Sequence, residues 1–149
     1  GLGLAKSSKF FVAMGGPGPI GNINMHSIAQ WNGTRWTTIG NGVNGNIYAM
    51  ATYGNNILVG GDFTEAGGIK ANRFAMWVGN KWDTLPNQIT GGSVYALTIW
   101  NNEIYAAGNL NLNNATGAFL IKWDGTNWLP VGNDVDYAVY ALEANGNNL

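Results

Sequence analysis

The stretch WDGTNW, residues 123–128, contains the motif that decides the fold. Two tryptophans enclose a four-residue segment with a glycine at its second position. The same arrangement occurs as WNGTRW, residues 31–36, and as WVGNKW, residues 77–82, so that successive copies are 46 residues apart and use six of the 7 tryptophans of the chain. A period of this length is typical of arrays of similar supersecondary units.

Each copy has the pattern of a tight β-hairpin. In the first copy, Gly33 and Thr34 suit a two-residue loop of type II′, which favours glycine at its first position. The two tryptophans would then lie opposite each other on one face, where an aromatic pair contributes roughly 0.2–1 kcal/mol. We interpret the hairpins as structural elements that fill the space between neighbouring repeats; platforms that stack on sugars are the alternative. The tryptophans concerned are Trp31, Trp36, Trp77, Trp82, Trp123 and Trp128.

The remainder of each repeat predicts three further strands. In the second copy, strands are expected near 46–53, 56–61, 73–78 and 81–85. The first two are apolar on both faces, which indicates burial on both faces. The fourth alternates polar and apolar residues, and its third copy contains Pro130, which favours a sheet edge.

This gradient from apolar to polar strands is typical of a radial array of four-stranded blades. The sequence therefore predicts an all-β chain that forms part of one β-propeller domain. The expected blades cover residues 1–41, 45–87 and 92–133, followed by a partial blade at 137–149.

A di-glycine after the second strand strengthens this prediction. Gly60-Gly61 has partial equivalents in Ala107-Gly108 and Met14-Gly15, and the string GGDFTEAGG follows in the second copy. Together with the W-x-G-x-x-W hairpins, this pattern resembles kelch-type β-propellers, most closely the subgroup found in bacterial secreted and surface proteins and in fungal cortical-marker proteins. The resemblance implies a propeller domain and an extracellular or cell-surface location. Propellers usually have 4–8 blades, so we expect the remaining blades to come from a longer chain or from self-association.

Composition excludes several classes of function. The net charge is −1 and only 10% of residues are charged, which argues against nucleic acid as a partner. The 7 basic residues are scattered and no apolar run is long enough to span a bilayer, so membrane insertion is not expected. The absence of cysteine excludes disulfides and thiolate metal sites.

The sequence offers little for catalysis. His26 is the single histidine, and no nucleophile motif accompanies it. Asp62 with Glu65, and Asp134 with Asp136, have oxygen ligands suited to calcium but too few of them for a calcium loop. We therefore predict no catalytic residue, no metal site and no cofactor.

The connections between strands differ in variability. In an up-and-down blade, the 2–3 and 4–1 connections emerge at one end of the strands and the short 1–2 and 3–4 turns at the other. The 2–3 segments are long and divergent among the copies, which favours a recognition face on a constant scaffold; neutral drift is the alternative. The predicted ligand-binding residues on this face are Asp62, Glu65, Asn109, Asn111, Asp134 and Asp136.

These observations favour a non-enzymatic binding, display or scaffold module of a larger surface or secreted protein, with a protein or glycan as its ligand. One alternative is part of a propeller enzyme whose catalytic residues lie outside this segment. Another is a purely structural component of an envelope or virion. Asn32 and Asn114 also stand in N-glycosylation sequons.

Overall fold

The computed structural model describes residues 3–6, 11–14, 18–20, 23–25, 27–86, 89–113, 115–132 and 135–149. Within these ranges the regular secondary structure consists of β-strands, and no helix occurs. The predicted all-β class is therefore confirmed for the described part of the chain.

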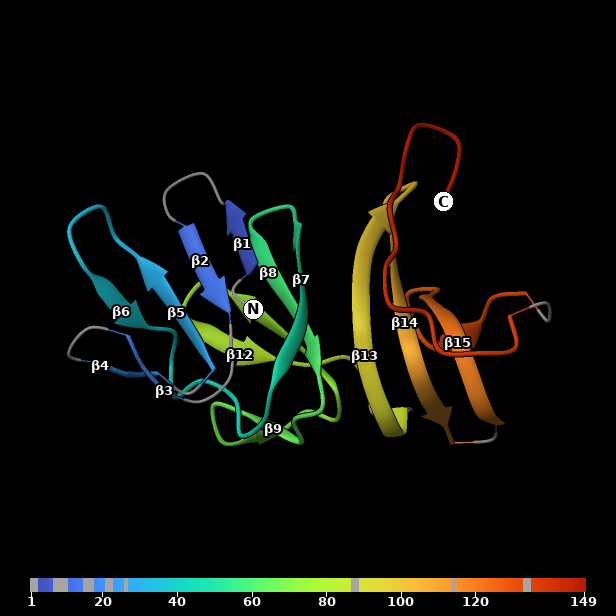
Figure 1. Cartoon of the computed structure of the whole chain (residues 1–149), viewed down its shortest axis with the longest axis horizontal. Coiled ribbons are helices and arrows are strands. Elements are labelled where there is room, and N and C mark those ends of the chain that lie inside the picture. Colours follow the sequence, from blue (N-terminus) through green and yellow to red (C-terminus); the bar gives the residue numbers. More distant parts are fainter. Residues whose placement is uncertain are drawn as a thin grey trace.

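Three four-stranded antiparallel sheets form the body of the molecule (Figure 1). In each, consecutive strands of the repeat pair side by side. The N-terminal sheet contains β1 (Gly3–Lys6), β2 (Phe11–Met14), β5 (Ile28–Trp31) and β6 (Trp36–Thr38). The central sheet contains β7 (Ile47–Tyr53), β8 (Asn56–Gly61), β11 (Phe74–Val78) and β12 (Lys81–Asp83). The C-terminal sheet contains β13 (Ile89–Trp100), β14 (Glu103–Leu112), β15 (Ala115–Trp123) and β16 (Trp128–Pro130).

Two small hairpins lie in the 2–3 connections. The hairpin of β3 (Gly18–Ile20) and β4 (Ile23–Met25) separates β2 from β5. The hairpin of β9 (Glu65–Ala66) and β10 (Ile69–Lys70) separates β8 from β11. The third copy differs, because β14 and β15 are separated only by residues 113–114.

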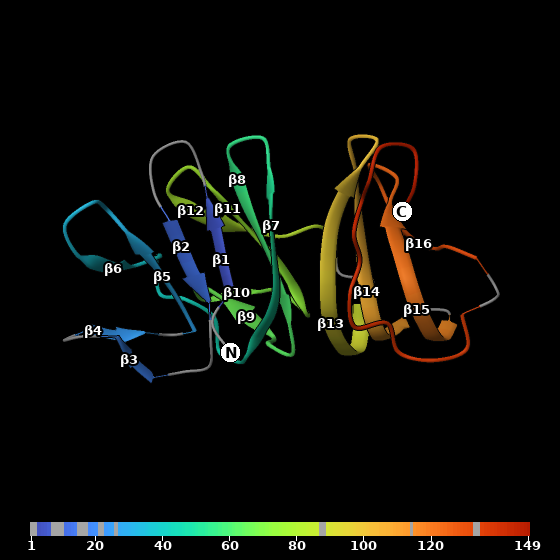
Figure 2. The same ribbon diagram turned by 45° about the horizontal axis from the view of Figure 1, so that its top comes forward.

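The sheets stack through their first strands. β7 contacts β1 on one side and β13 on the other (Figures 1 and 2). Ile57 and Val59 pack in a core with the N-terminal sheet, whereas Leu58 and Phe74 pack in a second core with the C-terminal sheet. The predicted burial on both faces is thereby confirmed for β8, whereas Tyr48 and Thr52 of β7 are exposed.

The fourth strands form the sheet edges. In β12, Trp82 is buried while its neighbours Lys81 and Asp83 are exposed, as the alternating pattern predicts. Pro130 lies in β16, the last strand in the order of the C-terminal sheet, where a missing N–H costs no ladder hydrogen bond.

The element bounds differ from the expectation at the third repeat. β13 begins at Ile89, three residues before the expected start at 92, because Ile89 pairs with Leu112 at the end of a lengthened β14. Residues 135–149 contain no strand, only an isolated bridge between Asn145 and Asn148. This segment runs beside β14 (Figure 2), where the Val139 N–H donates to the Gly108 carbonyl at 3.3 Å.

Candidate functional site

The tryptophans of each hairpin lie opposite each other in the strand register. Their ring centroids are 5.6, 5.3 and 5.6 Å apart in the three copies, and each pair is T-shaped. Gly33 and Gly125 have φ values of 100° and 101° at the first loop position. Positive φ is the property for which a type II′ loop requires glycine.

The hairpin loops of the first and third copies have a side-chain cap. The Asp124 carboxylate accepts hydrogen bonds from the backbone N–H groups of Thr126 and Asn127, at 2.7 and 2.6 Å. Hydrogen bonds from these two N–H groups lower the pKa of Asp124. Asn32 caps the first copy in the same way. Val78 replaces the capping residue in the second copy, and the strand pairing extends to it instead.

The second tryptophan of a hairpin packs against the preceding sheet. Trp82 is buried, and its indole N–H donates to the Ile39 carbonyl at 3.2 Å. Trp128 is also buried, and its ring lies 5.3 Å from that of Phe74 in the central sheet. Buried indoles offer no free face to a ligand, whereas Trp31, Trp36, Trp77 and Trp123 are half-buried.

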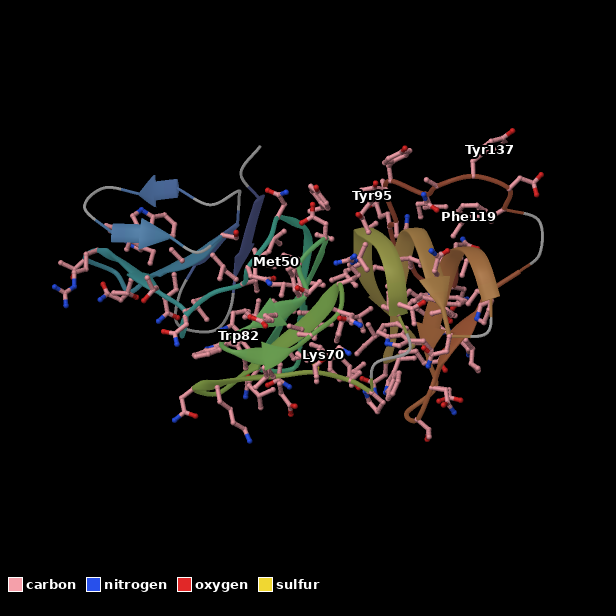
Figure 3. All side chains as sticks on the ribbon, turned by 90° about the horizontal axis from the view of Figure 1, so that it is seen from below. Met50, Lys70, Trp82, Tyr95, Phe119 and Tyr137 are labelled. Atoms are coloured by element: carbon pink, nitrogen blue, oxygen red, sulfur yellow. The ribbon has the colours of Figure 1, made fainter. Side chains whose placement is uncertain are left out.

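Equivalent tyrosines of successive repeats form a continuous row. Tyr48 and Tyr95 are tilted with their ring centroids 5.5 Å apart, and Tyr95 stacks on Tyr140 at 5.0 Å. Tyr48 and Tyr95 both lie at a β-bulge in the first strand of their sheet. A bulge turns a side chain out of the regular alternation, so that these tyrosines leave the core. In Figure 3, Tyr95 lies toward one side of the molecule and Trp82 toward the other.

Asp62 is the most connected of the predicted ligand-binding residues. Its carboxylate accepts hydrogen bonds from the Asn46 backbone N–H at 2.7 Å, from Asn46 Nδ2 at 3.0 Å and from the Tyr48 hydroxyl at 2.7 Å. Partial burial raises the pKa of Asp62, but these hydrogen bonds and the charge of Arg73 outweigh burial and lower it. The hydrogen bond to Asp62 correspondingly raises the pKa of Tyr48.

The 2–3 and 4–1 connections meet at the central sheet. Asn44, in the 4–1 connection, accepts hydrogen bonds from the backbone N–H groups of Thr64 and Glu65. Arg73 donates to the carbonyls of Asp62 and Phe63, which fastens the end of the 2–3 connection to its beginning. Exposed Glu65 borders a shallow hollow of about 90 Å³ between the two connections. We refer to this end of the strands as the loop end.

The remaining predicted ligand-binding residues are not brought together in this way. Asn109 and Asn111 lie in β14, opposite Ser93 and Gly91, and not in a loop as expected. The reason is visible in the sequence: in NLNL the two leucines are buried, and the asparagines that alternate with them continue the strand. Asp136 is exposed after β16. Asp134 and His26 lie outside the described residues.

A larger hollow than the one beside Glu65 lies at the opposite end of the strands, which we call the turn end. It is a cleft of about 330 Å³ between the central and C-terminal sheets. Tyr53 and Trp123 line it, together with the apolar side chains of Met76, Leu85 and Ile104. The sequence interpretation missed this cleft, because it depends on the spacing between two sheets; the only signal was an aromatic residue beside each turn.

Within the described ranges, no three histidine, cysteine, aspartate or glutamate side chains gather as a metal site would require. The same ranges contain no helix with the length and hydropathy of a membrane span. No protein-family model matches the chain, and comparison with curated proteins yields no match.

Proposed function

We propose that the three sheets are consecutive blades of a kelch-like β-propeller, and that this propeller is a non-enzymatic binding module of a surface or secreted protein. Its partner contacts the loop end, where the 2–3 and 4–1 connections meet. Further blades, from the same chain or from a second copy, complete the ring.

The tyrosine row carries the propeller proposal. Tyr48, Tyr95 and Tyr140 occupy equivalent positions of successive repeats, and each contacts the next at 5.5 or 5.0 Å. Equivalent residues meet in this way when each repeat contacts only its neighbours by a similar rotation. Because β7 lies between β1 and β13, the first strands occupy the inner positions of such an array.

The shape and polarity of the loop end favour a protein as its partner. The hollow beside Glu65 has a volume of about 90 Å³, whereas pockets that enclose small ligands have volumes of roughly 300–1,000 Å³. A shallow surface with exposed polar groups such as Thr64, Glu65 and Asn109 suits the polar, hydrogen-bonded rim of a protein interface. A glycan lying across the same surface is the alternative.

The test measures binding of the 149-residue chain to an array of purified secreted and surface proteins. The triple variant Thr64→Ala, Glu65→Ala, Asn109→Ala removes exposed polar groups from the loop end. We expect it to remain folded and to lose at least about tenfold in affinity for any protein bound by the wild type.

A matched control changes exposed residues at the turn end: Asn80→Ala, Lys81→Ala, Thr126→Ala. This variant should bind like the wild type. Loss of binding in the control with retention in the loop-end variant would place the interface at the turn end and contradict the proposal. Binding to a glycan array alone, abolished by the loop-end variant, would replace the protein partner with a glycan.

A further inference from the structure

We propose that the cleft between the central and C-terminal sheets is a second binding site, separate from the loop end, and that it accepts one pyranose unit of an uncharged glycan. The cleft volume of about 330 Å³ is at the lower limit of ligand pockets. It therefore suits a single ring and not an extended ligand.

The walls and floor provide the apolar contacts that such a ring needs. Tyr53 comes from β7 and Trp123 from β15, so each sheet contributes one aromatic side chain. The floor consists of Met76, Leu85 and Ile104, which all belong to the core between the two sheets. Aromatic faces pack well against the C–H face of a pyranose, whose other face and edges are polar.

The rim provides hydrogen-bonding groups. Asn56 and Asn102 lie at the short turns of the two sheets, and within the described residues neither side-chain amide has a hydrogen-bond partner. An amide both donates and accepts, as a sugar hydroxyl does. The Tyr53 hydroxyl donates to the Asn102 carbonyl at 3.3 Å, which joins the two sheets at the rim.

The charges of the cleft argue against anionic ligands. Glu103 accepts hydrogen bonds from Lys122 Nζ at 3.0 and 3.2 Å and from the Tyr105 hydroxyl at 3.1 Å. Lys122 is thereby neutralised, and among the described residues no cationic side chain lines the cleft to bind a phosphate or carboxylate. Asp124 uses Oδ1 for its own turn and leaves Oδ2 to accept from a hydroxyl.

The lining differs from the residues at equivalent repeat positions. In the preceding repeat, Ser7 and Phe10 stand at the positions of Tyr53 and Asn56, and Val78 stands at the position of Asp124. Packing alone would favour the same residue types in each copy, as it does for the tryptophan hairpins. Trp123 recurs as Trp77, so Tyr53, Asn56 and Asp124 are the lining residues that distinguish this interface.

The experiment is a titration of the isotope-labelled 149-residue chain with the methyl pyranosides of glucose, galactose, mannose and N-acetylglucosamine. Binding is followed by amide and indole N–H shifts in nuclear magnetic resonance spectra. We expect at least one pyranoside to shift signals of residues 53–56, 102–104 and 123–125, with a dissociation constant of about 1–10 mM. Asn56→Ala should weaken binding about fivefold, since it removes one hydrogen bond from an exposed turn.

Two control variants test whether binding depends on the polar rim of the cleft. Asn80→Ala and Lys81→Ala alter exposed residues of a turn outside the cleft, so both should bind like the wild type. The proposal is wrong if no pyranoside shifts these signals, if the shifts lie at the loop end, or if Asn56→Ala has no effect. Shifts produced by tetramethylammonium and by no pyranoside would make the cleft a cation site and equally overturn it.

Discussion

The central and C-terminal sheets are built from copies of the same sequence repeat but differ at the loop end. In the central sheet, Asp62 and Arg73 fold the 2–3 connection back onto its own base and onto the 4–1 connection. In the C-terminal sheet, Asn109 and Phe119 stand at the equivalent positions, and β14 and β15 continue almost to their turn. At the turn end, the two sheets have the same tryptophan hairpin.

This difference separates the residues that determine the repeat from those that determine its variable part. Residues that pack between sheets, such as Trp82 and Trp128, recur in every copy. The hydrogen bonds of Asp62 and Arg73 accompany a 2–3 connection that folds back, whereas β14 and β15 extend almost to their turn where these two residues are absent. The three predictions below test this division, starting with the packing residues.

The largest effect is expected from the buried tryptophans. Trp82→Ala and Trp128→Ala should each lower the free energy of unfolding by about 4 kcal/mol, because each removes a large buried aromatic side chain. Trp77→Ala should cost less, since Trp77 is only half-buried. Urea denaturation of the three variants measures the order. An equal cost for Trp77→Ala and Trp82→Ala would show that the pair is the packing unit and not the second tryptophan alone.

An intermediate effect is expected from the glycines that face the bulges. A Cβ on Gly61 would overlap the carbonyl oxygen of Asn46, and a Cβ on Gly108 would overlap that of Ser93. Gly61→Ala and Gly108→Ala should each lower the free energy of unfolding by about 3 kcal/mol, because the added Cβ would meet a backbone carbonyl that can move only if the sheet distorts. Gly54→Ala is the control: its φ of 59° is strained for alanine but its Cβ would meet no atom, so about 1–2 kcal/mol is expected. Thermal unfolding that ranks Gly54→Ala as the more harmful change would refute this account of the di-glycine.

The smallest effect is expected at the loop end, where Asp62 of the central sheet is compared with Asn109 of the C-terminal sheet. Asp62→Asn should lower the free energy of unfolding at pH 7 by about 2 kcal/mol, because an amide cannot accept all the hydrogen bonds of the carboxylate. Asn109→Asp should change it by less than about 0.5 kcal/mol, since among the described residues no equivalent donors face this exposed position. Because the folded state lowers the pKa of Asp62, its contribution is complete above the ordinary value of 3.8 and is lost as the pH falls through the folded pKa. The difference between wild type and Asp62→Asn, measured by urea denaturation, should therefore shrink below pH 3.8; a constant difference would contradict the assignment.

Much of the fold could be predicted from local pattern. The bounds of β8 and the start of β12 agree with expectation, because Trp spacing, glycine turns and apolar runs are each visible within a few residues. The loop-end site was less predictable. Asp62 and Glu65 were identified as polar residues of a divergent segment, but the hydrogen bonds of Asp62 with Asn46 and Tyr48 join residues 14–16 positions apart and depend on strand register.

By itself, the sequence determined the antiparallel hairpins, the order of strands within each sheet, and the buried character of β8 and the alternating burial of β12. These follow from side-chain alternation and turn chemistry, which are local properties. Only the tertiary structure decided that Tyr48, Tyr95 and Tyr140 form one row, and that a cleft remains between two sheets at the turn end. Each of these depends on the distance and register between separate sheets, which the sum of many small packing contacts sets and no short stretch of sequence contains.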